Sequence, residues 1–436
     1  MLLKFVLFAQ ILYVVNQVHF KWTTSIPGVV PTNLIFVAAL LLMRGQQETV
    51  TAKPILKKAL LFFFAAFTLA LLLGQVRSPG DLLDDLTYYK NALFFPLFYF
   101  MFLKCRQDEK TTRWLIIWVL VVAAVAGFEG LREGFDYGFG KYSPFRRASG
   151  PFGEDWHNAN RAGVFYGMFM PMFVAMALFL KRQKYWRLAA LGGCIVIAGG
   201  AISTYSRQSY FLVLLGIAVL LLRKSIILTV AISIVCVSLA GYLPESATQR
   251  VEETRQEGKP GASVEEEVDA STASRWEIWA GGMRMLASNP TGVGLNRWKK
   301  EIGSFCSHKG MDAHNFYVLT LGECGPVGLA TLLYLIYRLF VLAKWVRVNR
   351  PPDDPECTAL TLGFTVCTLN MALGGIYGSP TLEGAVMAPY WALCGLLERY
   401  ILLKMQGRGE APKSEKLADS MAERFPLASY IVPGRK

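Results

Sequence analysis

The sequence predicts an all-α membrane protein that crosses the bilayer about twelve times. Of its 436 residues, 53% are hydrophobic and only 18% are charged, with a mean hydropathy of +0.35. The apolar residues stand in long blocks, and a helix needs about 20 mostly apolar residues to cross the hydrocarbon core. One long polar interruption, roughly residues 244 to 313, separates two sets of these blocks. It predicts a large loop outside the membrane.

The candidate spans follow one another in chain order. Their approximate bounds are 2–18, 29–44, 57–76, 87–103, 114–131, 162–180, 186–203, 209–222, 226–243, 315–340, 358–377 and 384–403. No convincing small-residue cleavage site follows the first span, so we expect a retained helix and not a signal peptide. The chain therefore divides into transmembrane helices in 1–243, a loop domain in 244–313, further transmembrane helices in 314–405 and a tail in 406–436.

Basic residues give the predicted orientation. Loops after the even-numbered spans carry clusters of lysine and arginine, and by the positive-inside rule those loops face the cytoplasm. With an even number of spans, both termini then lie in the cytoplasm and the long loop lies outside. This topology accounts for the formal charge of +13, which leaves little reason to expect a nucleic-acid partner. The eight cysteines form no CxxC pair, so neither a disulfide framework nor a zinc site is predicted.

Several arginines nevertheless fall on the outer side, where the positive-inside rule does not require them. Arg207 stands in a short turn between two apolar helices, and no acidic residue is near it in sequence. An arginine there either snorkels to phospholipid headgroups or faces a partner. Because a guanidinium can hold two phosphate oxygens at once, an anion site is the better interpretation, and a lipid pyrophosphate would fit it. The other outward arginines are Arg146, Arg147, Arg161, Arg275, Arg284 and Arg297.

The long loop has two parts. Residues 245–269 are rich in glutamate and almost free of large apolar residues, so we expect a solvated segment, with a lid over the substrate as the alternative. From Ser271 the hydroxyl residues are typical of a helix start, and Asn289-Pro290 is typical of its end. Trp276, Trp279, Met283 and Leu286 recur at helical spacing, which predicts an interfacial helix or one docked on the membrane bundle.

His314 is the best candidate for a catalytic base among His19, His157, His308 and His314. A lone histidine is more often structural, but this one follows Asp312 and stands where a membrane-length helix begins. An imidazole titrates near neutral pH and can take a proton from a hydroxyl. Metal catalysis is not predicted, because no HExxH or Cys/His cluster is present. No phosphate-binding loop for a nucleotide appears either, so no cofactor is expected and a donor would already be activated on a lipid.

The combination of motifs resembles the O-antigen ligase and polymerase superfamily. The resemblance rests on Arg147 before Gly150-Pro151-Phe152, Ser206-Arg207, Arg275-x-x-x-Trp279, Asn289-Pro290-x-Gly292-x-Gly294, and His314-Asn315 followed by Glu323-x-Gly325. It implies a GT-C-like membrane glycosyltransferase that takes glycan from undecaprenyl pyrophosphate without metal or nucleotide. His314 would then be the base, Arg147 and Arg207 would bind the pyrophosphate, and Arg146, Arg161 and Arg275 would assist. Many relatives have Asn-Pro-Asn where this chain has residues 154–160, so the resemblance assigns no role there.

The expected function is therefore transfer of a lipid-linked glycan to an acceptor hydroxyl. The enzyme would lie in the inner membrane of a bacterium, with its active site on the periplasmic face. A ligase would use lipid A-core as acceptor, a polymerase would use a growing glycan, and an oligosaccharyltransferase would use a protein hydroxyl. An anion or sugar transporter is the rival from another class. It is disfavoured because no convincing pair of repeated halves with broken helices is visible.

Overall fold

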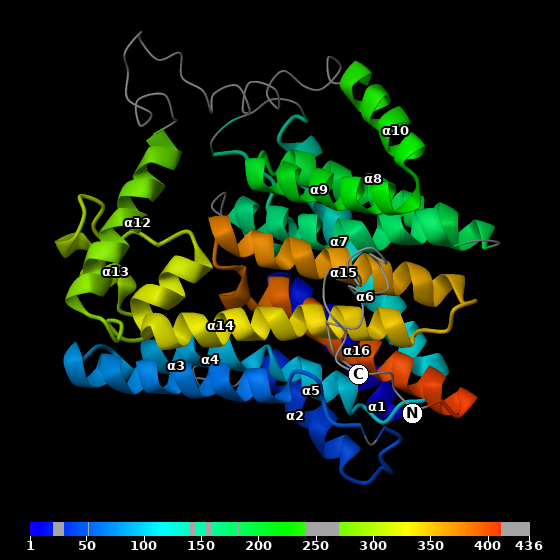
Figure 1. The fold of residues 1–436 in the computed structure, drawn as a ribbon, viewed down its shortest axis with the longest axis horizontal. Coiled ribbons are helices and arrows are strands. Elements are labelled where there is room, and N and C mark those ends of the chain that lie inside the picture. The colour runs from blue at the N-terminus through cyan, green and yellow to red at the C-terminus, as the bar shows by residue number, and fades with distance from the viewer. Residues whose placement is uncertain are drawn as a thin grey trace, which may run out of the picture.

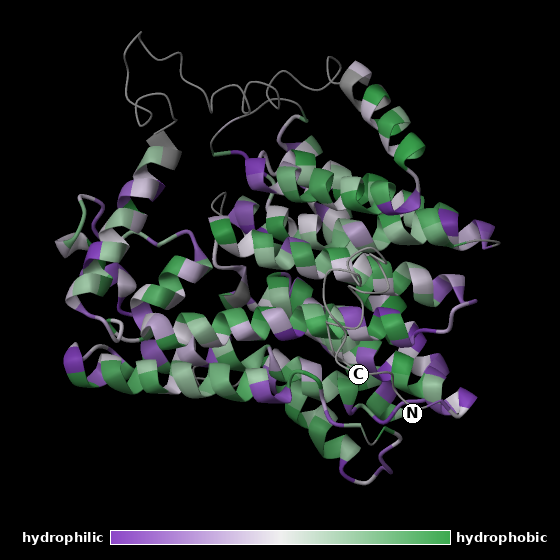
Figure 2. Ribbon diagram, viewed as in Figure 1, coloured by the Kyte–Doolittle hydropathy of each residue, from purple (hydrophilic) through white to green (hydrophobic). Residues whose placement is uncertain are grey.

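The computed structural model describes residues 1–20, 30–50, 52–139, 143, 145–153, 158–180, 183–239 and 270–410, and this part of the chain is mostly helical and contains no strand. The prediction for residues 245–269 falls outside the described residues, and so does His157. The helices lie side by side in one bundle (Figure 1). Hydrophilic residues gather mostly at the two ends of the bundle and in the unit around α12 and α13 (Figure 2). This distribution is the one expected of helices that cross a membrane.

Seven helices in the described residues are long and apolar enough to cross a membrane. They are α3 (Lys57–Arg77), α6 (Glu109–Asp136), α7 (Ala159–Phe179), α8 (Lys184–Ser203), α14 (Phe316–Asn349), Pro355–Tyr377, which comprises α15 (Pro355–Gly374) and η5 (Gly375–Tyr377), and α16 (Gly384–Arg408). The all-helical class is confirmed, and the described residues contain seven candidate spans where the sequence predicts about twelve.

The other five predicted spans are shorter or more charged. Two correspond to the short apolar helices α1 (Leu2–Asn16) and α2 (Pro31–Met43). The predicted helix at 87–103 is divided by Pro96 into α4 (Leu82–Phe94) and α5 (Leu97–Leu103), since proline lacks the N–H that a continuous helix requires. The last two are α9 (Arg207–Lys224), which carries charges at both ends, and α10 (Ile226–Leu239).

Helix α7 lies at the centre of the part of the bundle that holds the outward arginines. It packs against α8, α9 and α15, and most of its residues are buried. At Gly163 a side chain would meet the Cβ of Ser209 at 2.8 Å, so this glycine allows the start of α9 to approach closely. Farther along the bundle, the Asn370 amide of α15 donates to the carbonyls of Gly167 at 2.6 Å and Leu212 at 2.8 Å. These contacts fix the position of Arg207 relative to α7 and α15.

Helix α14 is kinked near its start. Gly325 has φ 68° and ψ −173°, and Pro326 follows it, so the helical hydrogen-bond pattern is interrupted here. The carbonyls of Gly322 and Glu323 accept instead from Val293 N at 2.9 Å and Gly294 N at 3.0 Å. The kink thus provides the acceptors that attach the end of the polar region to the membrane bundle.

Helices α12 (Ala270–Ser288) and α13 (Trp298–Glu301) and the short η4 (Ile302–Ser304) form a unit at the end of the bundle where α14 begins (Figure 1). The predicted helix start near Ser271 and its end at Asn289-Pro290 are confirmed. The predicted contact stripe is wrong in detail, because Met283 is exposed and the buried face is formed by Ile278 and Met285. Two glycines determine which face of α12 is buried. Gly282 allows the Trp298 ring to pack closely, and Gly281 allows Cys306 to do so.

Candidate active site

His314 lies in the connection between η4 and α14, and the residues on both sides of it hold its backbone. Its N–H donates to Asp312 Oδ1 at 3.1 Å. The Asn315 side chain caps α14 by accepting from Tyr317 N at 2.9 Å and Val318 N at 3.0 Å. His314 itself has φ 48°, a conformation that non-glycine residues rarely adopt. Such a residue persists where its surroundings hold it, and functional sites are one place where these residues cluster; Arg106, Tyr205 and Asn296 share the conformation.

The surroundings of His314 favour a neutral imidazole. The side chain is half-buried, and this burial is the main cause that lowers its pKa from the ordinary value of 6.5. Asp312 acts in the opposite direction and raises the pKa, whereas the positive charges of Arg275 and Lys299 lower it further. At neutral pH the ring is therefore deprotonated and can accept a proton.

Arg275 reaches this neighbourhood from α12. Its guanidinium carbon lies 5.7 Å from the centre of the Tyr377 ring, at the end of η5. One turn later Trp279 contacts the same ring at 5.9 Å and donates from Nε1 to the carbonyl of Ala313 at 2.8 Å. Helix α12 is thus fixed against both η5 and the residue that precedes His314.

Arg161 and Glu383 add a second charged pair. Arg161, in the first turn of α7, forms an ion pair with Glu383, which precedes α16, with 2.8 Å between Nη2 and Oε1. Burial raises the pKa of the Glu383 carboxyl, Arg161 and Lys299 lower it, and Asp312 raises it. Lys299 Nζ and Asp312 Oδ2 lie 3.8 Å apart. The charges of these two residues therefore affect the pKa of both Glu383 and His314. The two groups share one electrostatic neighbourhood.

Arg207 is the first residue of α9. The next residue, Gln208, contacts the chain just before η5, the short helix that Arg275 also contacts. Gln208 donates from Nε2 to the carbonyl of Gly374 at 2.7 Å, immediately before η5. One residue after η5, the carbonyl of Gly378 accepts from Phe316 N at 3.0 Å, at the start of α14. The segment 374–378 therefore connects the start of α9 with the start of α14 and with Arg275.

Arg147 is buried, with 7% of its surface exposed, and supports the turn that precedes Arg207. Its Nε donates to the carbonyl of Thr204 at 2.9 Å, and its Nη2 donates to Asn160 Oδ1 at 2.7 Å. Glu133 of α6 holds the loop from the other side, since its Oε2 accepts from Ser149 N and Gly150 N at 2.9 and 2.7 Å. Arg146 is exposed on the same loop.

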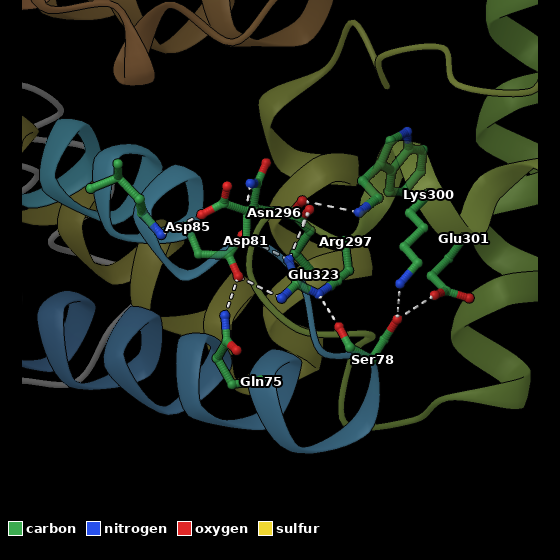
Figure 3. Close-up of polar contacts among 11 residues, drawn as sticks. Gln75, Ser78, Asp81, Asp85, Asn296, Arg297, Lys300, Glu301 and Glu323 are labelled. Carbon is green, nitrogen blue, oxygen red and sulfur yellow. Dashed lines mark hydrogen bonds and ion pairs between the residues drawn. The ribbon is translucent and has the colours of Figure 1, made fainter.

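The structure shows a buried polar cluster that the sequence did not predict (Figure 3). Arg297 and Asp85 are only 3% and 1% exposed and form a two-armed ion pair, with 2.7 Å between Nη1 and Oδ1. Arg297 also donates from Nε to the carbonyl of Ser78 at 2.6 Å, and Asn296 Nδ2 donates to Asp85 at 2.8 Å. The hydrogen bond from Arg297 is the main cause that lowers the pKa of the Asp85 carboxyl. The cluster joins the start of α4 to the segment that leads into α13.

Glu323 extends this cluster into α14. Its carboxylate accepts from the backbone N–H of Trp298 at 3.2 Å and from the Tyr88 hydroxyl at 3.3 Å. The sequence does contain a signal for this contact, because a glutamate inside an apolar segment needs a partner. The sequence does not show which residue is the partner of Glu323. The glycines of the Asn289-Pro290 motif have a structural role here: at Gly294 (φ 101°) a Cβ would lie 2.2 Å from the Cα of Gly74.

Residues 156–333 match the model of the O-antigen ligase family. These residues belong to the O-antigen ligase and polymerase superfamily. No curated protein resembles the chain closely enough to count as a match. The O-antigen ligase region contains α7, α9, α12 and the kinked start of α14, and with them Arg161, Arg207, Arg275 and His314. Glu383 and Arg147 lie outside it on either side. The family carries out glycosyltransferase-type ligation or polymerisation in membranes, and the seven apolar helices agree with a multi-pass membrane protein.

Proposed function

We propose that the protein transfers a glycan from undecaprenyl pyrophosphate to an acceptor hydroxyl, with His314 as the general base and without a metal ion. The observation that carries this proposal is the environment of His314. A half-buried imidazole whose pKa is lowered stands beside Arg275 and Lys299, in the region that matches the O-antigen ligase family. A neutral base surrounded by positive charge suits the attack of a hydroxyl on an anionic donor.

The reaction needs one proton acceptor and one anion site. The acceptor oxygen attacks the anomeric carbon of the glycan, while the bond from that carbon to the pyrophosphate oxygen breaks. The hydroxyl proton passes to His314, and undecaprenyl pyrophosphate leaves with the bonding electron pair. Negative charge grows on the leaving oxygen, so arginines placed near it stabilise the transition state more than the ground state.

We assign the pyrophosphate to Arg207, Arg161 and Arg275. Arg161 contacts Glu383 and Arg275 contacts Tyr377, and Arg207 precedes Gln208, which donates to Gly374. Arg147 supports this site mainly through the Thr204 turn, because two of its guanidinium nitrogens are engaged by Thr204 and Asn160. Arg146 is exposed on the same loop and is suited to attract the anionic donor.

We place this site at the periplasmic face of a bacterial inner membrane, with both termini in the cytoplasm. The support is the distribution of lysine and arginine in the loops at the opposite end of the bundle. The proposed acceptor is lipid A-core. A polymerase or a protein O-oligosaccharyltransferase would use the same base and the same anion site, so the acceptor is the point at which these functions differ.

The direct test is transfer by the purified enzyme in lipid vesicles that contain a polyprenyl-pyrophosphate glycan and lipid A-core. His314→Ala should reach the membrane normally and lose transfer by a factor of about 10² to 10⁴. His308→Ala is the matched control: His308 lies in the same connection but pairs with Glu277, with 3.2 Å between Nδ1 and Oε2, and its loss should leave transfer unchanged. Wild-type turnover by His314→Ala would refute the proposal.

A deletion strain distinguishes the acceptors. Loss of polymer on lipid A, with lipid-linked polymer intact, indicates a ligase, whereas accumulation of single repeat units indicates a polymerase. Loss of glycan from a protein with normal lipopolysaccharide indicates an oligosaccharyltransferase. Substrate flux across vesicles without any glycan transfer would indicate a transporter.

A further inference from the structure

Tyr377 is an exposed aromatic residue beside the candidate active site, and it has no role in the reaction proposed above. It ends η5, and 41% of its surface is exposed. The Trp279 ring contacts the Tyr377 ring and donates to the carbonyl of Ala313, the residue before His314. After His314, the N–H of Phe316 donates to the carbonyl of Gly378, the residue that follows Tyr377. Contacts therefore tie Tyr377 to the chain on both sides of His314.

The Tyr377 ring is held in place without being covered. The guanidinium carbon of Arg275 lies 5.7 Å from the ring centre, and the Trp279 ring is inclined to it at 45°. The backbone before it is fixed by the hydrogen bond from Gln208 to the carbonyl of Gly374. Among the residues that the structure describes, none forms a hydrogen bond with the Tyr377 hydroxyl. A ligand can therefore contact both the ring and its hydroxyl.

We propose that Tyr377 stacks on the donor sugar that is bonded to the pyrophosphate, and so orients its anomeric carbon toward the acceptor hydroxyl at His314. This inference rests on the transfer reaction proposed above. One face of a pyranose ring consists of C–H groups with a small positive charge, and the face of an aromatic ring is negative, so the two faces attract each other. The sugar hydroxyls stay at the ring edge, where they remain free to form hydrogen bonds. Tyrosine suits this task because its rigid side chain loses little conformational entropy on binding.

The position of Arg275 favours the donor sugar as the ligand. Arg275 is one of the arginines assigned above to the pyrophosphate, and its guanidinium already contacts the Tyr377 ring. A sugar bonded directly to that pyrophosphate would lie within reach of the same ring. Aromatic residues at this level of a membrane protein can also anchor it to lipid headgroups. The contacts of Tyr377 with Arg275 and Trp279 of α12, and its links to both neighbours of His314, favour a role in substrate binding.

The test is saturation-transfer difference NMR of the full chain in detergent, with the reducing glycan that mild acid releases from the host's lipid-linked donor. This probe lacks the pyrophosphate, so it reports on contacts with the sugar alone. The wild type should saturate the C–H protons of the reducing-end sugar most strongly. Tyr377→Ala and Tyr377→Leu should bind the glycan about tenfold more weakly, whereas Tyr377→Phe keeps the aromatic face and should stay within about twofold of the wild type. The control, Tyr185→Ala, removes an exposed tyrosine from the first turn of α8 and should bind normally.

Transfer kinetics separate this inference from the proposed function. His314→Ala should lose transfer and still bind the glycan like the wild type, whereas Tyr377→Ala should raise the donor KM about tenfold and leave the acceptor KM unchanged. Unchanged glycan binding by Tyr377→Ala would overturn the inference even if the wild type transfers glycan. It would also be overturned by a rise in the acceptor KM alone. Equal effects of the Ala, Leu and Phe variants on kcat and on the melting temperature, with no change in the donor KM, would give Tyr377 a purely structural role.

Discussion

Arg161 and Glu383 form an ion pair with 2.8 Å between Nη2 and Oε1, and this pair joins the start of α7 to the start of α16. The two side chains are 47% and 32% exposed, so the pair contributes little to stability, about 0 to 1 kcal/mol. Its importance is positional, because Asp312 and Lys299 act on both Glu383 and His314. A phosphate bound at the proposed site would compete with the Glu383 carboxylate for Arg161.

The first prediction follows from this competition. Arg161→Gln should raise the donor KM about tenfold, since one charge-assisted hydrogen bond to phosphate is lost. Glu383→Gln should lower the donor KM or leave it unchanged, because the competing carboxylate is gone. Donor titrations of both variants in vesicles provide the measurement, and melting temperatures near the wild-type value are the control. An increase in KM of similar size in both variants would mean that Glu383 orients Arg161 and does not compete for it.

The second prediction concerns pH. Transfer should decline on acidification as His314 becomes protonated, and this acidic limb should lie below the ordinary imidazole pKa of 6.5. Asp312→Asn removes the charge that raises the pKa, so the limb should move to lower pH. Lys299→Gln removes a charge that lowers the pKa, so the limb should move to higher pH.

Rate profiles of kcat/KM against pH for the wild type and these two variants test the assignment. The asparagine at position 312 keeps an oxygen that can accept from His314 N, so the backbone turn is preserved and only the charge changes. If both limbs move in the same direction, or neither moves, the titrating base is another group.

The third prediction separates Arg147 from Arg207. Because Arg147 is buried and bonded to Thr204 and Asn160, Arg147→Lys should destabilise the protein by about 1 to 3 kcal/mol and reduce kcat through the displaced turn. Arg207→Lys should destabilise the protein less than Arg147→Lys and raise the donor KM. Thermal unfolding in detergent and steady-state transfer assays measure both effects. The opposite pattern would make Arg147 the direct phosphate ligand.

The fourth prediction concerns the buried pair in Figure 3. Asp85→Asn should destabilise the protein by about 3 to 5 kcal/mol, because it removes the ion-pair partner of the buried Arg297 guanidinium. The double variant Asp85→Leu/Arg297→Met should be less destabilised than Asp85→Asn, since no uncompensated charge remains. Thermal unfolding of the two variants in the same detergent provides the comparison. A double variant less stable than Asp85→Asn would show that the polar cluster is itself stabilising.

Much of the fold could be predicted because its signals are local. Apolar blocks identify the long helices, and hydroxyl residues followed by Asn289-Pro290 identify α12. Errors occurred where a neighbouring element decided the outcome. Met283 was expected on the contact stripe of α12, but the Trp298 ring packs at Gly282 and shifts the buried face to Ile278 and Met285. No pattern within α12 contains that information.

The candidate site shows the same division. The position of His314 before α14 could be inferred from its own sequence, since Asp312 and Asn315 form the turn and the cap around it. The partner of Arg297 could not, because Asp85 is remote in sequence and lies beside an apolar segment that gives no indication of a contact. Buried charges need partners, but their sequence spacing does not identify those partners.

The sequence by itself determined the helical class, the order of the long helices and the resemblance of residues 156–333 to the O-antigen ligase family, and it made His314 the candidate base. These properties depend on hydropathy, capping and motif order, which are local features of the amino-acid sequence. Only the tertiary structure decided that Arg161 meets Glu383, that Arg147 supports the turn before Arg207, and that α12 brings Arg275 to η5. Those contacts depend on which helix faces pack together. Burial in lipid makes every apolar face equally favourable, so packing at small residues and pairing of the few charged groups select among them.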